Sequence, residues 1–160
     1  MRLRPYIPDT DFDHIRKWDT DERTHALWCA GRLPFPVTRE SMDALINDHA
    51  VKYGDTPFIA TEDGGRPVGF FCIATDVQTN TSMLRFVMVD SSLRGKGYGK
   101  EMLSLAVKYA FDIAKADTVQ LNVFTQNEAA KNATSALDSP KCQSLRMYSP
   151  TRMNHGADAI

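Results

Sequence analysis

The sequence contains few cysteines and no long hydrophobic run. Cys29, Cys72 and Cys142 are odd in number and widely spaced, with neither the CxxC nor the Cys/His pattern of a metal site. Reduced, buried thiols in the cytoplasm are the default for such a set. No apolar run approaches the length of a membrane span, and the N-terminus lacks the apolar core of a signal peptide. We therefore expect a cytoplasmic protein without a metal and without a membrane partner.

An excess of charge of either sign is also missing. The 19 lysines and arginines nearly balance the 20 aspartates and glutamates, and the formal net charge is −1. No global field attracts the chain to nucleic acid, so we expect no nucleic-acid partner. The length of 160 residues suits a single domain, residues 1–160, with a real hydrophobic core.

Segment 84–101 carries the strongest functional signal. An apolar run at 84–89 has the length of a strand, and apolar residues recur at helical spacing in 102–110. Three glycines and three cations occupy the seven residues 94–100. Glycine leaves the backbone open, so several N–H groups can converge on one anion at the start of the helix. The pattern predicts a cradle for a pyrophosphate.

The spacing separates the possible cradles. A P-loop requires Gly-x4-Gly-Lys-Ser/Thr, but Arg94 stands at its first glycine and Glu101 at its hydroxyl. The dinucleotide fingerprint Gly-x-Gly-x-x-Gly meets Lys100 at its third glycine, and no βαβ unit opens the chain. An ordinary glycine-rich connection between a strand and a helix has no need of so many cations. None of these patterns accounts for the segment.

The pattern that fits is Arg/Gln-x-x-Gly-x-Gly, which Arg94, Gly97 and Gly99 satisfy behind a strand that ends Val-Met-Val-Asp. On these residues the chain resembles the GCN5-related N-acetyltransferase (GNAT) superfamily, over about residues 2–133. The resemblance implies an α+β, three-layer fold, in which a central mixed, mostly antiparallel sheet has helices on both faces. Its element order is β-α-α-β-β-β-α-β-α, and the chain offers no clear counterpart of the family's last two strands.

The residue pattern places these elements along the chain. Asp9 or Asp11 can cap the first helix. A hairpin signal at 62–65 joins the second and third strands. The expected strands are 2–5, 56–61, 67–75, 84–89 and 119–124, and the expected helices run to Trp18, over 21–30, from Thr38 through Val51, from the glycine loop to about Ala116, and from Asn127 to Ala133.

The resemblance implies acetyl-CoA as co-substrate, held where the fourth and fifth strands separate. The loop amides would hold its pyrophosphate, and free backbone groups of Val87 and Val89 would pair with the pantetheine arm like an added strand. Asn127 and Ala130 match the family segment Asn-x-x-Ala-x-x-x-Tyr, whose asparagine usually meets the cofactor. The implied cofactor-binding residues are Val87, Met88, Val89, Arg94, Gly95, Lys96, Gly97, Tyr98, Gly99, Lys100, Asn127 and Ala130.

The sequence does not identify the catalytic residues. A base or a water chain should take the proton of the amine, and a weak acid should protonate the leaving thiolate. Glu22, His25, Asp76 and Asp90 are weak base candidates, and nothing selects one of them. The family's acidic tyrosine falls on Thr134, whose hydroxyl is too short and too weakly acidic for that role. No metal is required.

The remaining conspicuous residues have structural interpretations. The four histidines are scattered and lack ligand spacing, so we expect them to be solvated or bonded locally. Trp18 and Trp28 lie among apolar neighbours at helical spacing, which predicts core positions. Phe35 lies in a loop where the family often shapes its acceptor pocket.

The chain departs from the family after about Asn132. Read from the third base of the Asn132 codon, the same DNA can encode Cys-Tyr-x-x-Ala-Gly-Phe, with tyrosine at position 134, as the family pattern requires. We interpret residues 133–160 as an aberrant tail, irregular or dependent on a partner, produced by a frameshift or by natural divergence. Without two further strands the fifth strand would be an exposed edge, which favours a homodimer, strand exchange and poor catalysis.

Three functions are compatible with these features. The first is an N-acetyltransferase that moves acetyl from acetyl-CoA to a primary amine by direct attack in a ternary complex, with activity impaired by the altered C-terminus. The second is a CoA-binding pseudoenzyme, or a poorly active, truncated acetyltransferase. The third is a nucleotide-phosphate protein, against which the missing Ser/Thr at position 101 argues.

The acceptor is expected to be a small-molecule or peptide amine. The Leu-Arg-Pro opening and segment 28–38 are similar to the subgroup that acetylates ribosomal-protein N-termini. Polyamine, amino-sugar and antibiotic acceptors stay open.

Overall fold

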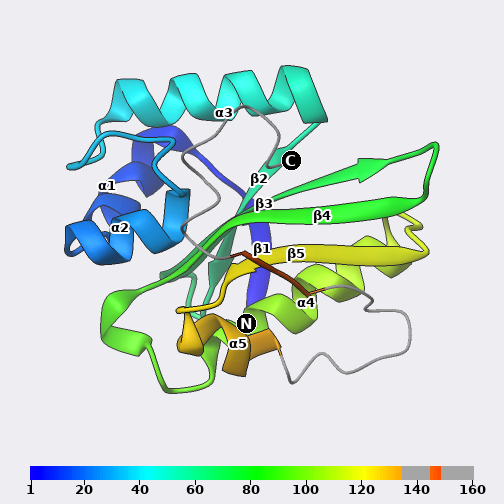
Figure 1. The fold of residues 1–160 in the computed structure, drawn as a ribbon. Helices are drawn as coiled ribbons and strands as arrows, with labels where there is room; N and C mark the ends of the chain where they lie inside the picture. Colours follow the sequence, from blue (N-terminus) through cyan, green and yellow to red (C-terminus); the bar gives the residue numbers. More distant parts are fainter. Residues whose placement is uncertain (135–144, 149–160) are drawn as a thin grey trace.

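The computed structural model describes residues 1–134 and the backbone of 145–148, which together form one six-stranded sheet (Figure 1). The strands follow their sequence order across the sheet. The first three pairings are antiparallel and the last two are parallel, so the sheet is mixed and mostly antiparallel, as predicted. The strands are β1 (Arg2–Pro5), β2 (Thr56–Thr61), β3 (Pro67–Asp76), β4 (Thr81–Val89), β5 (Thr118–Phe124) and β6 (Leu145–Tyr148).

The helices cover both faces of the sheet (Figure 1). Three of them, α1 to α3, separate β1 from β2 and pack on one face, whereas α4 packs on the other and α5 lies against it. The fold class is therefore confirmed, with one more helix before β2 than the family order lists. The helices are α1 (Pro8–Trp18), α2 (Glu22–Cys29), α3 (Arg39–Tyr53), α4 (Tyr98–Asp112) and α5 (Glu128–Thr134), with a short 3-10 helix, η1 (Ser91–Leu93), before α4.

Strand β3 connects two hydrophobic cores. Adjacent strand residues point to opposite faces, and both Phe70 and Phe71 are fully buried. Phe70 packs with α1 to α3, and Phe71 packs with Leu103 and other residues of α4. Because both faces of the sheet are covered, most residues of β3 are apolar and do not alternate with polar ones. Burial of each phenylalanine contributes about 2–3 kcal/mol of transfer free energy.

Two helix starts follow the sequence signals. Asp21 caps α2 by accepting a hydrogen bond from the Thr24 amide, and Thr38 caps α3 in a reciprocal arrangement with Ser41. The three hydrogen bonds that Asp21 accepts from Thr24 and Thr20 lower the pKa of its carboxyl to about 2.

The predicted cap of α1 is wrong. The helix starts after Ile7, and neither Asp9 nor Asp11 caps it as the residue preceding the helix. Asp11 is fully buried, where it accepts hydrogen bonds from the Arg4 guanidinium at 2.7 Å and from the Ile7 amide at 2.7 Å. Burial raises the pKa of this carboxyl, but these hydrogen bonds outweigh burial and leave the pKa lowered. Val51, in the last turns of α3, is 88% exposed although it is apolar.

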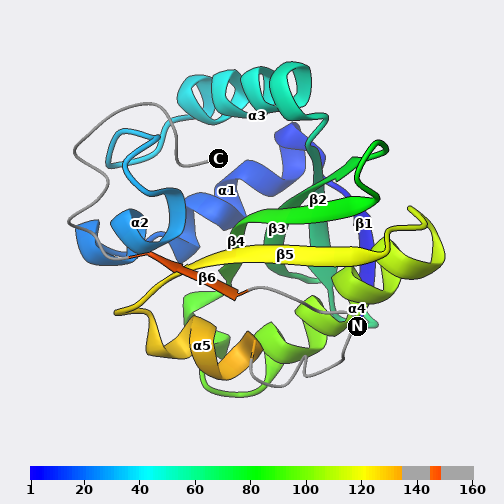
Figure 2. The same cartoon turned by 45° about the vertical axis from the view of Figure 1, so that its right-hand side comes forward.

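The predicted exposed edge at β5 is wrong as well. Strand β6 pairs with β5 in parallel from Leu121↔Leu145 to Phe124↔Tyr148. Figure 2 shows β4, β5 and β6 side by side. A strand of four residues inside a polar run is too short to show a pattern of alternation. Residues 135–144 and 149–160 lie outside the described part of the chain, and so does most of the tail to which the frameshift hypothesis applies.

Candidate active site

Strands β4 and β5 pair only over part of their length. Their register runs from Thr81↔Thr118 to Leu84↔Leu121, and among the described residues it does not continue beyond that pair. In the next segment β4 has one residue more than β3, which makes a bulge. Phe86 lies in this bulge with φ 52°, and its carbonyl accepts a hydrogen bond from Trp28 Nε1 at 2.9 Å. The structure therefore has the separation of strands that the family resemblance implied.

The glycine segment turns sharply before α4. Gly95 has φ 77° and Gly97, which directly precedes the helix, has φ 88°. These values lie in the left-handed region that glycine adopts at little cost. A Cβ atom built on either glycine would have no heavy atom within 4 Å. The turn thus borders open space, which a side chain at either position would enter.

Four amides at the start of α4 have no acceptor among the described residues. Lys96 donates to the Leu93 carbonyl and Glu101 donates to the Gly97 carbonyl. For the four amides between them, 97–100, the described residues provide no acceptor. The first turn of a helix leaves such N–H groups unpaired, and its dipole adds partial positive charge. The geometry fits a bound phosphate or pyrophosphate.

A cavity of about 750 Å³, here the large cavity, extends from this turn to α5. It is lined by ten of the twelve residues that the resemblance implied. Lys96 and Tyr98 are not among its lining residues. Tyr98 instead donates a hydrogen bond from its hydroxyl to Glu62 Oε1 at 2.8 Å, and this bond raises the pKa of Tyr98. The ten are Val87, Met88, Val89, Arg94, Gly95, Gly97, Gly99, Lys100, Asn127 and Ala130.

Helix α5 closes the large cavity with polar groups that bond to their own helix. Asn127 Oδ1 accepts from the Ala130 amide at 3.0 Å and so caps the helix. Thr134 is 3% exposed, and its hydroxyl lies 2.9 Å from the Ala130 carbonyl and 3.0 Å from the Lys131 carbonyl. In this orientation Thr134 does not offer its proton to the cavity.

A second cavity of about 160 Å³, here the small cavity, shares the lining residues Leu27, Trp28, Val87, Asn127 and Ala130 with the first one. Its described lining includes His49 and Arg85, which share a buried partner. His49 Nδ1 lies 2.9 Å from Asp55 Oδ2, and Arg85 donates to Asp55 Oδ1 at 2.6 Å. The Asp55 side chain is only 1% exposed. The carboxylate therefore orients both side chains without reaching the cavity itself.

Two further contacts define this network. The Arg85 guanidinium lies over the Tyr53 ring at 4.9 Å from its centroid. Arg32 lies at the rim, with one guanidinium nitrogen 3.5 Å from His49 Nε2. Since arginine only donates, His49 Nε2 is the acceptor and Nδ1 carries the proton that faces Asp55. Cys29 also lines the small cavity, and burial raises the pKa of its thiol.

Sequence reasoning missed this network. A spacing of six residues connects His49 with Asp55 across the end of α3, but Arg85 comes from β4, 30 residues beyond Asp55. His25 forms a similar buried pair with Asp19, at 2.7 Å, and its Nε2 lies 2.9 Å from the Leu33 carbonyl. Both histidines are thus bonded locally, as expected, but only His49 is among the residues that line a cavity.

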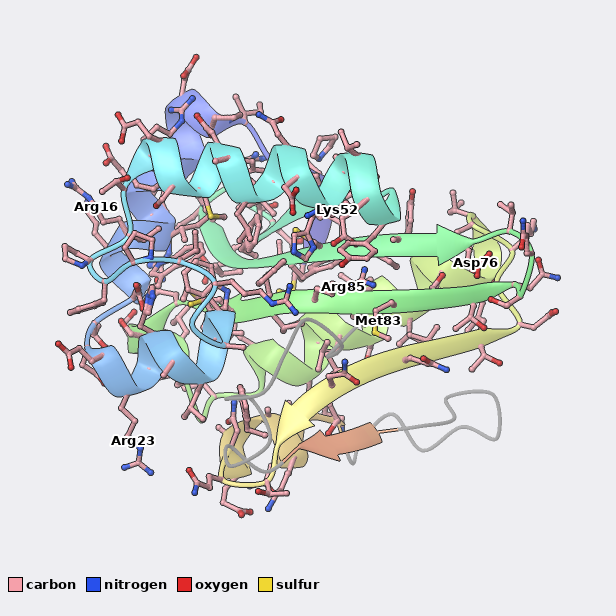
Figure 3. All side chains as sticks on the ribbon, turned by 45° about the horizontal axis from the view of Figure 1, so that its top comes forward. Arg16, Arg23, Lys52, Asp76, Met83 and Arg85 are labelled. Atoms are coloured by element: carbon pink, nitrogen blue, oxygen red, sulfur yellow. The ribbon has the colours of Figure 1, made fainter. Side chains whose placement is uncertain are left out.

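The base candidates other than His25 have local structural partners or exposed positions. Glu22 is exposed in the first turn of α2. Asp76 accepts from the Gln78 amide in the β3–β4 turn, and Figure 3 shows it at the end of the sheet opposite to Arg23 of α2. Asp90 accepts from the amide and hydroxyl of Ser92. None of the three lines either cavity within the described part of the chain.

The open helix turn beside a separated pair of parallel strands provides a cavity that fits a phosphate-bearing ligand. The model of the Acetyltransferase (GNAT) family matches residues 12–135. The chain therefore belongs to the GNAT family of acetyltransferases, and the predicted family, class of enzyme and co-substrate are confirmed. Among curated protein sequences none matches this chain.

Solved structures with the same fold include acetyltransferases of two substrate classes. The spermidine N-acetyltransferase of Vibrio cholerae, in complex with CoA and spermine, has a TM-score of 0.70 at 15% identity, covering 86% of this chain and 79% of that one. The aminoglycoside acetyltransferase AAC(6')-Ib, in complex with ribostamycin and coenzyme A, has a TM-score of 0.69 at 16% identity, with 84% and 79% covered. At 15–16% identity, these comparisons show that the fold is shared and do not identify the substrate of this chain.

The described residues include no group of three or more histidine, cysteine, aspartate or glutamate side chains placed to hold a metal ion. Among the helices at 1–134, none is long and apolar enough to cross a bilayer.

Proposed function

We propose that this protein transfers an acetyl group from acetyl-CoA to a primary amine by direct attack, with both substrates bound together. The observation that carries the proposal is that Val87, which lies on β4 beyond the last residue paired with β5, lines both cavities. The large cavity is also lined by Gly97 and Gly99 at the start of α4, and the small cavity is lined by His49. Such an arrangement can hold a long CoA and a small amine against one another.

The large cavity fits the implied co-substrate. The amides of 97–100 would bind the pyrophosphate, with Arg94 and Lys100 beside them. The backbone of Val87 to Val89 would hold the pantetheine arm and place an N–H at the thioester carbonyl. Fixing both reactants in this way can remove about 7–11 kcal/mol of the barrier.

His49 is proposed as the acceptor of the amine proton. Among the described residues of the small cavity, it is the side chain of a type that exchanges protons near neutral pH. Its Nδ1 proton faces Asp55, which fixes the tautomer and leaves Nε2 as the proton acceptor. The neutral amine then attacks the thioester carbon, the carbon–sulfur bond breaks, and the thiolate takes up a proton. The proton donor to the thiolate is not assigned.

One observation favours a second function, a CoA-binding protein without useful turnover. Thr134 stands where the family has its acidic tyrosine, and its hydroxyl is turned to the backbone of α5. The cradle at α4 does not depend on that residue. CoA can thus bind while protonation of the leaving thiolate is slow.

Two measurements separate these functions. Calorimetry with acetyl-CoA tests the cradle, and release of free CoA thiol over a panel of primary amines tests the transfer. Binding together with thiol release supports the enzyme, binding alone supports the second function, and no binding contradicts both. The homodimer and the cytoplasmic location remain predictions, which sedimentation and cell fractionation can test.

A further inference from the structure

The small cavity is lined mainly by apolar side chains. Eleven of its sixteen described lining residues are apolar. The five polar ones are Arg32, His49, Arg85, Asn122 and Asn127. His49 and Arg85 are bonded to Asp55, whose carboxylate offsets the positive charge of Arg85 at 2.6 Å. Asn127 accepts from the Ala130 amide. A ligand in this cavity therefore meets mostly apolar surface.

Two aromatic side chains of this wall are held in place by the protein. Trp28 donates a hydrogen bond from Nε1 to the Phe86 carbonyl at 2.9 Å. The centroid of the Phe86 ring lies 4.9 Å from that of the His49 ring. A third aromatic residue, Phe124, lines the same cavity from the end of β5. Preformed aromatic walls favour an apolar ligand of matching shape, and this wall adjoins the proposed base.

The volume of the small cavity limits the ligands that fit. At about 160 Å³ it is comparable with an apolar protein cavity of about 150 Å³ that binds benzene. One six-membered ring, or an alkyl group of similar size, can therefore be buried here, whereas two fused rings exceed the space. An ammonium group beyond the reacting one would leave water for a mainly apolar wall, which is costly.

We propose that the acceptor is a compact apolar amine, in which one primary amino group is attached to a single ring or to an alkyl group of similar size. This inference rests on the proposed acetyl transfer and names the class of acceptor. The apolar part would lie against Trp28, Phe86 and Phe124, with the amino group at His49. Polyamines and amino sugars carry several charged or hydroxyl groups, which would lose their water against this wall, so these amines would bind poorly.

Binding of acetylated products tests the polarity of the cavity without depending on turnover. NMR titrations on CoA-loaded protein would compare N-propylacetamide with N-acetylethanolamine, which has a hydroxyl in place of the last methyl group. We expect N-propylacetamide to bind at least about fourfold tighter, the factor for one buried methylene or methyl group. Binding of N-acetylethanolamine or N1-acetylspermidine as tight as that of N-propylacetamide, or tighter, overturns the inference.

The same titrations test the size of the cavity. N-benzylacetamide should bind about tenfold tighter than N-propylacetamide, because its ring buries more apolar surface. N-(1-naphthylmethyl)acetamide, with two fused rings, should bind no tighter than N-propylacetamide. Equal affinities for the benzyl and naphthyl products in the unchanged protein overturn the single-ring limit and with it the inference.

Variants of matched chemistry connect the size limit to the wall. F124A enlarges the small cavity, so the naphthyl product should bind at least about fourfold tighter to this variant than to the unchanged protein. The control is F111A, because Phe111 is partly buried beside α4 and lines neither cavity. Its affinity for the naphthyl product should stay within about twofold of the unchanged protein. Circular dichroism shows whether F124A is folded, and L27A enlarges the cavity from α2 if it is not. No gain in the folded variant over F111A overturns the inference.

Release of free CoA thiol separates failure of this inference from failure of the proposed function. Faster release with benzylamine than with ethanolamine and spermidine supports the inference. Faster release with ethanolamine or spermidine overturns the acceptor class and leaves acetyl transfer intact. Release with none of the three amines contradicts acetyl transfer, and the product titrations alone then decide which class of ligand the small cavity takes.

Discussion

The two cavities that share Val87 use different chemistry. The large cavity is lined by Gly97, Gly99 and Lys100 at the positive end of α4, whose amides have no acceptor among the described residues. The small cavity offers the side chains of His49 and Arg85, held by the buried carboxylate of Asp55. Backbone donors depend on the conformation of one turn, whereas side-chain donors depend on the pairing of buried charges. Substitutions should therefore affect CoA binding and acetyl transfer separately.

The largest expected effect comes from the glycine turn. In G97V the side chain enters the open space and the residue resists a φ of 88°, so CoA affinity should fall by roughly 100-fold. The matched control is G54V, at a glycine with φ 73° that also has open space around it but lines neither cavity. Both variants should lose stability, and only the first should lose CoA binding in calorimetry. Equal CoA affinities would refute the cradle.

The next effect concerns the small cavity. H49Q should lower kcat by about 100-fold at unchanged CoA affinity, because a positioned base typically contributes at least this factor. H25Q, the matched control, removes the other buried histidine–aspartate pair, which lines neither cavity. The H25Q variant should have a lower melting temperature but a kcat within about threefold of the unchanged protein, because His25 takes no part in the proposed proton transfer. An unchanged kcat in H49Q would show that His49 is not the base.

The third prediction concerns the buried charge on the α1 side of the sheet. D11N leaves Arg4 without its carboxylate and should lower the free energy of unfolding by about 2–3 kcal/mol at pH 7. The folded pKa of Asp11 lies below its ordinary value, so its contribution is complete above the unfolded pKa and is lost as the pH falls through the folded one. Urea unfolding at pH 6 and pH 3 should show a smaller acid loss in D11N. CoA affinity of the folded variant should not change.

The smallest expected effect is a difference in CoA affinity between variants of Lys96, which precedes α4, and of Lys100, in its first turn. Lys100 lines the large cavity and Lys96 does not. K100Q should weaken CoA binding about two- to fivefold at low salt, and K96Q by less, because charges near a helix start contribute modestly and are screened. Titrations at two salt concentrations measure the difference. A larger effect in K96Q would mean that the loop binds the pyrophosphate in another orientation.

The large cavity was predictable because its requirement is local. A turn with positive φ next to a helix start needs glycines at fixed positions, and Gly95 and Gly97 stand there in the sequence. The antiparallel strands β2, β3 and β4 are likewise predicted by short apolar runs in the sequence. Ten of the implied residues therefore come together in one cavity.

The small cavity was not predictable because its residues have no local requirement. His49 and Asp55 come from the end of α3, and Arg85 from β4, so only the folded sheet brings them together. For the same reason the sequence suggests Asp9 or Asp11 as a helix cap, although Asp11 pairs with Arg4 from the strand that precedes the helix. Tertiary pairs of this kind leave no periodic signal in a single sequence.

The parting of β4 from β5 has a consequence for solubility. Strand edges with unpaired amides normally invite other chains to add to a sheet, which leads to aggregation. Here the unpaired part of β4 is an inner edge, bordered by Trp28 of α2 and by α5. The proposed pantetheine arm would need the space of a single strand there, whereas a neighbouring β-sheet would meet these helices. We therefore expect this edge to be less open to self-assembly than the outer edge of a sheet.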